Sequence, residues 1–359
     1  MGVSAPALPG PSRAGTTPVS RAWWRSPVLL LLLLTPGIPE YLTGSSSATL
    51  LFLNPLAFAL FFALNAGLYT TGALLIREAV VRWGKGWGSV LLLGAAYGIV
   101  EEGLAVHTFF QTSGTTVGAL GTYGHLWGVN WVWALGLSVF HAVYSIALPI
   151  LLLGIVYPET RGRSLIAGRG IATTMGLYLA DVLLLTLIAP NHPNAAQTAF
   201  FVAVVGLLVY LAFRIPSSLL KAKAGRSTAT PRRFALLGCG LFFLWLIVSA
   251  LLPRTGVPPV VDVAVFVGVL LAILYDVLRS VGTVDAERAQ LAFAAGLLIP
   301  LIPWELLLVG ASNPIALVLG ILTLFALYRL RRRVWARTEL PPPPSATLES
   351  LPRGAVAHA

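Results

Sequence analysis

Two adjacent carboxyl groups, Glu101 and Glu102, lie in the middle of GSVLLLGAAYGIVEEGLAVHTFF, a stretch otherwise apolar enough to span a bilayer. The next apolar stretch, LGLSVFHAVYSIALPILL, carries His141, and the one after it, GLYLADVLLL, carries Asp181. An ionised group at mid-bilayer costs roughly 2.5 to 3.5 kcal/mol on insertion scales, so such residues usually have a function. Carboxyl groups beside a histidine suit a general base that activates water, and they equally suit a proton relay.

These four residues fall at similar predicted depth on three consecutive membrane helices. Antiparallel helices joined by short connections are usually neighbours, so we expect one polar pocket that contains all four side chains. Adjacent residues of an α-helix point about 100° apart. We therefore expect only one of Glu101 and Glu102 to point squarely into this pocket, while the other leans toward its flank.

The composition is that of a chain surrounded by lipid. Hydrophobic residues make up 57% of the sequence and charged residues only 10%, against roughly 25% charged residues in an ordinary globular protein. The net charge of +11 comes from short basic clusters between apolar runs, a distribution that reflects membrane topology and not a nucleic-acid footprint. We therefore expect the lipid bilayer, and no nucleic acid, as a partner.

The predicted fold class is all-α, a polytopic integral membrane helix bundle with nine to ten transmembrane helices, because each apolar run has bilayer length. The expected spans are residues 27–42, 50–76, 88–110, 131–157, 170–189, 198–214, 234–252, 259–278, 290–311 and 313–329. The first run also has the basic flank and short apolar core of a signal peptide, with Ala48 as a conceivable cleavage edge, but we expect a retained helix.

The basic residues indicate the orientation of these spans. With ten spans, every Lys and Arg except Arg254 falls on one side of the membrane. Positive charge is concentrated in cytoplasmic loops. The pattern predicts a multi-pass protein of the cell membrane with both termini in the cytoplasm.

Composition also divides the chain into five segments. We expect a disordered cytoplasmic tail, a six-helix membrane part with the polar pocket, a basic cytoplasmic linker, a four-helix membrane part and a disordered Pro-rich tail. Their predicted bounds are 1–22, 23–216, 217–233, 234–337 and 338–359.

Other charged residues have structural interpretations. Glu305 and Asp262 stand alone in their spans and are expected to make hydrogen bonds between helices. Glu40 follows a proline near the outer surface, which indicates an interfacial position. Glu78 and Arg82 are four residues apart at the end of a span, the spacing of a solvated helical ion pair.

A glycine-rich connection without Lys or Arg, QTSGTTVGALGTYGHLWGVN, covers residues 111–130, with His107 just before it and His125 inside it. An ordinary flexible outer loop fits this composition. A lid or re-entrant segment folded over the pocket is the alternative.

Several chemistries lack their sequence signals. HExxH, GxSxG and Walker-type motifs are absent from the chain. Its one cysteine, Cys239, lies in an apolar run, which excludes an intrachain disulfide and a thiol-based metal site. Glu, His and Asp from separate helices have no metal-ligand spacing, so we expect neither a metal nor another cofactor.

The Glu-Glu pair followed by a histidine resembles the CPBP family of glutamic intramembrane proteases, which includes the type II CAAX prenyl endopeptidases. That family has EExxxR, FxxxH and HxxxN motifs in successive membrane helices. Here Glu101 and Glu102 match the pair and His141 matches the second histidine, whereas Val106 and Leu137 replace the arginine and phenylalanine, and HxxxN is missing downstream. The resemblance covers residues 87–158 and implies that one glutamate and His141 activate water for peptide-bond hydrolysis.

Three functions follow from these residues. The leading hypothesis is an intramembrane endopeptidase with Glu101 or Glu102 as general base, His141 as its partner and Asp181 in support, acting on a peptide, prenylated peptide or small-molecule substrate. The alternatives are a proton-coupled transporter that uses the same carboxyl groups, and a non-catalytic scaffold whose basic loops bind anionic lipid or a partner protein.

Overall fold

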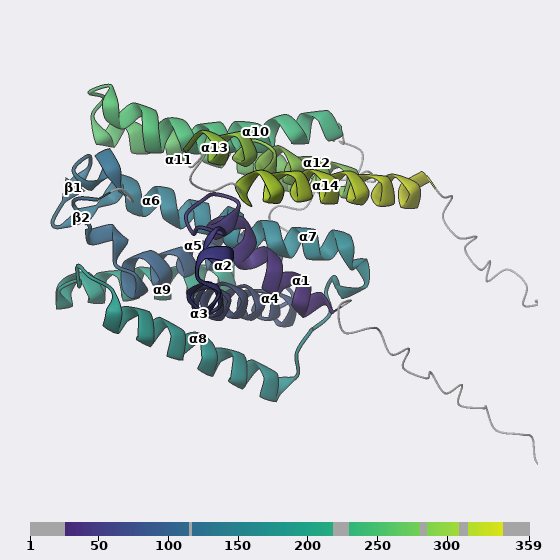
Figure 1. Cartoon of the computed structure of the whole chain (residues 1–359), viewed down its shortest axis with the longest axis horizontal. Helices are drawn as coiled ribbons and strands as arrows, with labels where there is room; N and C mark the ends of the chain where they lie inside the picture. The colour runs from purple at the N-terminus through teal and green to yellow at the C-terminus, as the bar shows by residue number, and fades with distance from the viewer. Residues whose placement is uncertain (1–25, 115–116, 218–229, 281–285, 309–314, 340–359) are drawn as a thin grey trace, which may run out of the picture.

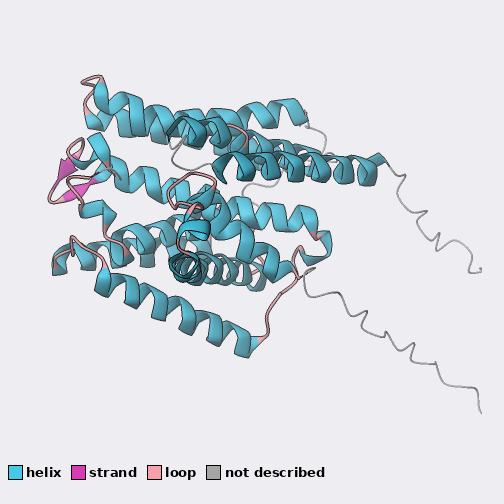
Figure 2. Ribbon diagram, in the orientation of Figure 1, coloured by secondary structure: helices cyan, strands magenta, loops and turns pink. Residues whose placement is uncertain are grey.

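The chain folds into a bundle of helices that run roughly along one common direction (Figures 1 and 2). The computed structural model describes residues 26–114, 117–217, 230–280, 286–308 and 315–339. Helices are the expected outcome for apolar runs in lipid, because a helix satisfies its backbone hydrogen bonds internally. The all-α polytopic fold class is therefore confirmed.

Fourteen α-helices occur in the described residues. Those of the first half are α1 (Pro27–Pro36), α2 (Leu50–Leu53), α3 (Pro55–Asn65), α4 (Thr71–Arg82), α5 (Trp87–Ile99), α6 (Trp131–Phe140) and α7 (Leu148–Val156). Those of the second half are α8 (Gly168–Ile188), α9 (Ala195–Arg214), α10 (Pro231–Leu246), α11 (Pro259–Ser280), α12 (Ala286–Leu298), α13 (Leu301–Leu308) and α14 (Ile315–Glu339).

Short π-helical segments continue several of these helices without a break. They are η2 (Gly37–Tyr41), η3 (Ala66–Thr70), η4 (Val100–Ala105), η7 (His141–Ala147) and η9 (Ile247–Leu251). Single turns of 3₁₀-helix form η5 (Thr108–Phe110), η6 (Gly118–Gly121), η8 (Pro158–Thr160) and η10 (Leu252–Arg254).

Among the described residues, eight helices are long and apolar enough to cross a membrane, fewer than the nine to ten predicted. The first predicted span, residues 27–42, forms a shorter apolar helix, Pro27–Tyr41. In the last predicted span, residues 313–329, the apolar part of α14 is followed closely by four arginines, Arg329, Arg331, Arg332 and Arg333. Leu31 of α1 is nevertheless fully buried and packs in one cluster with Leu74 and Leu153, so this helix belongs to the folded core.

Helices α10 to α14 lie together along one side of the bundle, beside the earlier helices (Figure 1). The largest apolar cluster joins both groups, because Val143 and Leu148 pack in it with Leu241 and Leu297. The division at residues 217–233 into two membrane parts stays a prediction. The predicted N-terminal tail, and most of the predicted linker and C-terminal tail, lie outside the described residues.

Residues 111–130 are folded, except for two residues outside the description. Strands β1 (His125–Leu126) and β2 (Val129–Asn130) pair as an antiparallel hairpin, and Leu120 and Val129 are buried. The side-chain amide of Asn130 donates to the Gln111 carbonyl. The glycine content of residues 111–130 predicted a flexible loop. The structure has instead a hairpin and buried side chains in this segment.

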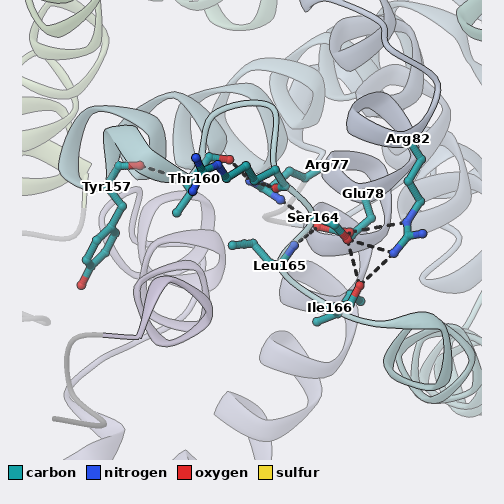
Figure 3. A network of polar contacts seen from close by, with 9 residues as sticks. Arg77, Glu78, Arg82, Tyr157, Thr160, Ser164, Leu165 and Ile166 are labelled. Carbon is teal, nitrogen blue, oxygen red and sulfur yellow. Dashed lines mark hydrogen bonds and ion pairs between the residues drawn. The ribbon is translucent and has the colours of Figure 1, made fainter. Parts of the chain in front are cut away.

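A buried polar network fixes the connection after α7 to the end of α4 (Figure 3). Arg77 contacts Glu78 at 2.7 Å and donates to the carbonyls of Thr160 and Arg163 at 2.5 and 2.8 Å. Glu78 in turn accepts from the Leu165 N–H at 2.8 Å. The pair of Glu78 and Arg82 predicted from their spacing forms, with a contact at 3.6 Å. The prediction that this pair is solvated is wrong for Glu78, whose side chain is only 2% exposed because the connection folds over it.

Candidate functional site

The two predicted glutamates and the predicted histidine all lie on π-helical turns. Helix α5 passes into η4, which carries Glu101 and Glu102, and α6 passes into η7, which begins at His141. A π-turn inserts an additional residue into a helix, and such turns are frequent at functional sites. The sequence predicted continuous α-helices here, since π-turns leave no mark in the hydrophobic pattern.

Close packing of α5 against the start of η7 brings these groups together. Gly98 lies one turn before Glu102, and a Cβ atom placed on it would be 3.0 Å from the Cβ of His141 and 3.0 Å from the Cα of Ser138. A glycine at this position therefore allows an approach that a larger residue would prevent. Small residues commonly mediate such contacts between membrane helices.

His141 lies between the two carboxylates. Its Nδ1 is 3.0 Å from Oε2 of Glu101, and its Nε2 is 3.0 Å from Oε1 of Glu102. The prediction that only one glutamate would point squarely into the pocket is therefore wrong. The π-helical turn changes the angle between the adjacent side chains, and the two ring nitrogens point to opposite flanks of the imidazole, so each carboxylate meets one of them.

The site is almost closed to solvent. The side chains of Glu101 and His141 are 5% and 3% exposed, whereas that of Glu102 is 12% exposed. Ser145, one turn after His141 on η7, is fully buried with its Oγ 2.9 Å from Nδ1. Glu102 is therefore the member of this cluster that the protein covers least.

A second layer of hydrogen bonds holds Glu102. The Thr108 hydroxyl donates to Oε2 of Glu102, and the indole N–H of Trp133 donates to the Thr108 hydroxyl at 3.2 Å. One carboxylate oxygen thus faces His141 and the other faces Thr108. This arrangement fixes the orientation of the carboxylate that is nearest to solvent.

The cluster extends to a residue that sequence reasoning set aside. The Tyr69 ring, on η3, lies 6.0 Å from the His141 ring between centroids. Its hydroxyl donates to Oε1 of Glu40 at 2.6 Å, and the Ser46 hydroxyl donates to Oε2 of Glu40 at 2.6 Å. Glu40, on η2, is therefore partly buried and hydrogen-bonded from another helix, and its interfacial position stays a prediction.

Asp181 lies apart from the His141 cluster. It faces Gly67 of η3, where an added Cβ atom would be 3.1 Å from the Asp181 Cγ. Its Oδ2 is buried and has no hydrogen-bond partner among the described residues. The structure thus brings together Glu101, Glu102 and His141, and it adds Glu40, Tyr69 and Ser145 to them.

Glu101, Glu102 and His141 could also bind a metal ion. One ligand atom from each lies within 4.8 Å of the others. Carboxylate oxygens and an imidazole nitrogen are ligand types that zinc accepts. Each imidazole nitrogen of His141 faces a carboxylate, and a single metal ion would bind one of these two nitrogens.

His107 closes the end of η4 outside the spans. It is buried and adopts a left-handed backbone conformation with φ of 62°. Its ring nitrogens lie 3.2 Å from the Pro190 carbonyl and 3.1 Å from the Leu104 carbonyl. Burial lowers the pKa of His107 below its ordinary value.

A protein-family model described as an uncharacterized membrane protein family matches residues 29–334. This range contains every residue of the candidate site, and the chain belongs to that family. Neither a curated protein nor a solved structure matches the chain. The family supports a multi-pass membrane protein embedded in lipid.

Proposed function

We propose that this membrane protein is an intramembrane hydrolase that cleaves peptide bonds with water activated by Glu102 and His141. The observation that carries the proposal is the contact of both ring nitrogens of His141 with the two carboxylates, each at 3.0 Å. A general base is held by a hydrogen bond to a partner group, and the contact of Nε2 with Glu102 has the distance of such a bond.

The residues divide into roles by exposure. Glu102 is the most exposed of the three, so it is the carboxylate that meets the attacking water. Ser145 is hydrogen-bonded to Nδ1 of His141 and holds the ring in position, as a third group does in catalytic triads. Oε2 of Glu101 lies 3.0 Å from the same nitrogen but makes no hydrogen bond among the described residues. His141 contacts Glu102 through Nε2 and exchanges a proton with it.

The reaction then proceeds in two steps. Glu102 takes a proton from water as the water oxygen bonds to the carbonyl carbon of the substrate, which forms a tetrahedral intermediate. The carbon–nitrogen bond then breaks, and the proton held by Glu102 and His141 passes to the leaving nitrogen. Each proton that leaves the water is returned to the products, so the reaction needs neither an oxidant nor a further reactant.

Cleavage of fluorogenic transmembrane peptides by the purified full chain in proteoliposomes tests this function. Glu102→Gln and His141→Ala are expected to lower the cleavage rate about 100-fold or more, the usual contribution of a general acid or base. Glu305→Gln is the matched control, because it neutralises a buried carboxyl group outside the His141 cluster. Equal rates for Glu102→Gln and Glu305→Gln would contradict the proposal.

A specific observation also supports a second function, proton-coupled transport. The Glu40–Tyr69 pair lies beside His141, so three carboxyl groups line a path along which protons can move. Transport predicts that Glu40→Gln stops pH-driven substrate uptake into proteoliposomes. Hydrolysis predicts instead that Glu40→Gln retains more of the cleavage rate than Glu102→Gln.

We also propose that the protein resides in the cell membrane with both termini in the cytoplasm. The clustering of Lys and Arg supports this orientation. The test uses reporter domains that are active on only one side of the membrane. One is fused at the C-terminus and should report the cytoplasm, and one is fused at Thr255, between η10 and α11, and should report the outer side. Identical signals at both positions, or a C-terminal reporter that reads the outer side, would contradict this assignment.

A further inference from the structure

A groove with apolar walls runs between the first helix and the last. Helix α1 and η2 form one wall, α14 forms the other, and Leu152 of α7 and Leu298 of α12 contribute to the floor. Its volume is about 590 Å³, within the range of sites that hold small molecules. The site at His141 is not part of its lining.

Two arginines are the charged residues of this lining. Arg329 and Arg333 lie one helical turn apart on α14, so they share one face of the helix. Neither forms an ion pair among the described residues, although Arg329 lies over the Phe325 ring at 5.9 Å. Arg337, one turn further, contacts Glu287 at 3.2 Å. The groove therefore combines an apolar wall with positive charge that no carboxylate of the described chain balances.

These features match the chemistry of a lipid with an anionic headgroup. Arginine binds phosphate through two parallel hydrogen bonds, and basic pockets between membrane helices bind anionic headgroups. The two arginines lie at the basic end of the bundle, where Arg161 and Arg337 share Glu287. An acyl chain placed along Leu30, Leu34 and Leu330 would meet only apolar side chains.

We propose that this groove binds an anionic phospholipid, with the headgroup phosphate on Arg329 and Arg333 and an acyl chain between α1 and α14. The site is separate from the proposed hydrolytic centre and does not depend on it. Two segments connect it to that centre: η2, where Gly37 and Ile38 line the groove on the turn that carries Glu40, and α7, which continues η7.

Native mass spectrometry of the purified full chain titrated with phosphatidylglycerol tests the charge requirement. Arg329→Gln with Arg333→Gln is expected to weaken binding about 30-fold, the combined effect of two basic residues at a membrane surface. Arg331→Gln with Arg332→Gln removes the same charge from the same helix but outside the groove, so it should leave most of the affinity. Equal losses in the two double variants would overturn the proposal in favour of general charge attraction.

A second variant tests the acyl-chain position. Gly37 lines the groove, and a Cβ atom placed on it would meet nothing within 4 Å, so Gly37→Leu is chosen to extend a side chain into the groove. It should weaken phosphatidylglycerol binding while the melting temperature of the lipid-free protein stays unchanged. Unchanged binding would overturn the proposal. Equally tight binding of glycerol phosphate, a free headgroup without acyl chains, in the same titration would also overturn the proposal.

Discussion

His141 differs from a histidine that merely fills a helix interface, because each of its ring nitrogens faces a carboxylate. Three ionisable groups in such contact can pass a proton from one to the next. A site of this kind can hold a proton and release it again, which is the property that hydrolysis and proton transfer both require.

The pH dependence of stability is predicted from His107. Burial lowers its pKa below the ordinary value of 6.5. As the pH falls below 6.5, the unfolded chain therefore takes up a proton before the folded chain does, and stability decreases until the folded pKa is passed. Above that window both states are neutral and His107 contributes no pH dependence.

Melting temperatures of the full chain between pH 5 and pH 7.5 measure this effect. His107→Gln should remove part of the decrease at low pH. The matched control is His125→Gln, in the hairpin that follows, which is expected to retain the decrease. An identical pH profile for the wild type and His107→Gln would contradict the assignment to His107.

The π-helical turns are the elements that assemble the site. Four π-helical turns carry the polar residues of the site. Glu40 lies on η2 and Tyr69 on η3, Glu101 and Glu102 lie on η4, and His141 and Ser145 lie on η7. Each turn interrupts the regular hydrogen bonding of its helix. We interpret these local departures as the means by which polar side chains from four helices are directed to one place.

The contact between α5 and η7 predicts opposite effects for two glycine substitutions. Gly98→Ala should destabilise the protein by about 1 to 3 kcal/mol, because its Cβ would press on His141 and Ser138. Gly206→Ala, on α9, meets nothing within 4 Å and should be neutral or slightly stabilising. Thermal unfolding in detergent compares them, and equal stability of the two variants would show that this contact is loose.

The connection after α7 depends on a buried ion pair. Arg77→Gln leaves the buried Glu78 without its closest cation and is expected to cost about 3 to 5 kcal/mol. Arg82 contacts the same carboxylate, but its side chain is 42% exposed, so Arg82→Gln should cost less than about 1 kcal/mol. Denaturant unfolding measures the free energy of unfolding of both variants. A larger loss of stability for Arg82→Gln than for Arg77→Gln would contradict this prediction.

At the scale of the whole molecule, the sequence was sufficient for the membrane class and for the association of Glu101, Glu102 and His141. Both depend on apolar runs of bilayer length and on ionisable residues that interrupt them. The role of Glu40 was missed, because its partner Tyr69 is 29 residues away on another helix. The burial of Glu78 was missed for a similar reason, since the connection that covers it begins beyond α7.

The measurement that tests the central claim most directly is isotope incorporation during cleavage. Proteoliposomes with the full chain and a mixture of transmembrane peptides are incubated in water labelled with ¹⁸O, and new peptide C-termini are analysed by mass spectrometry. Activation of water by Glu102 and His141 predicts new C-termini that carry ¹⁸O with the wild type and about 100-fold fewer with Glu102→Gln. New termini without ¹⁸O, or equal numbers with both proteins, would contradict it.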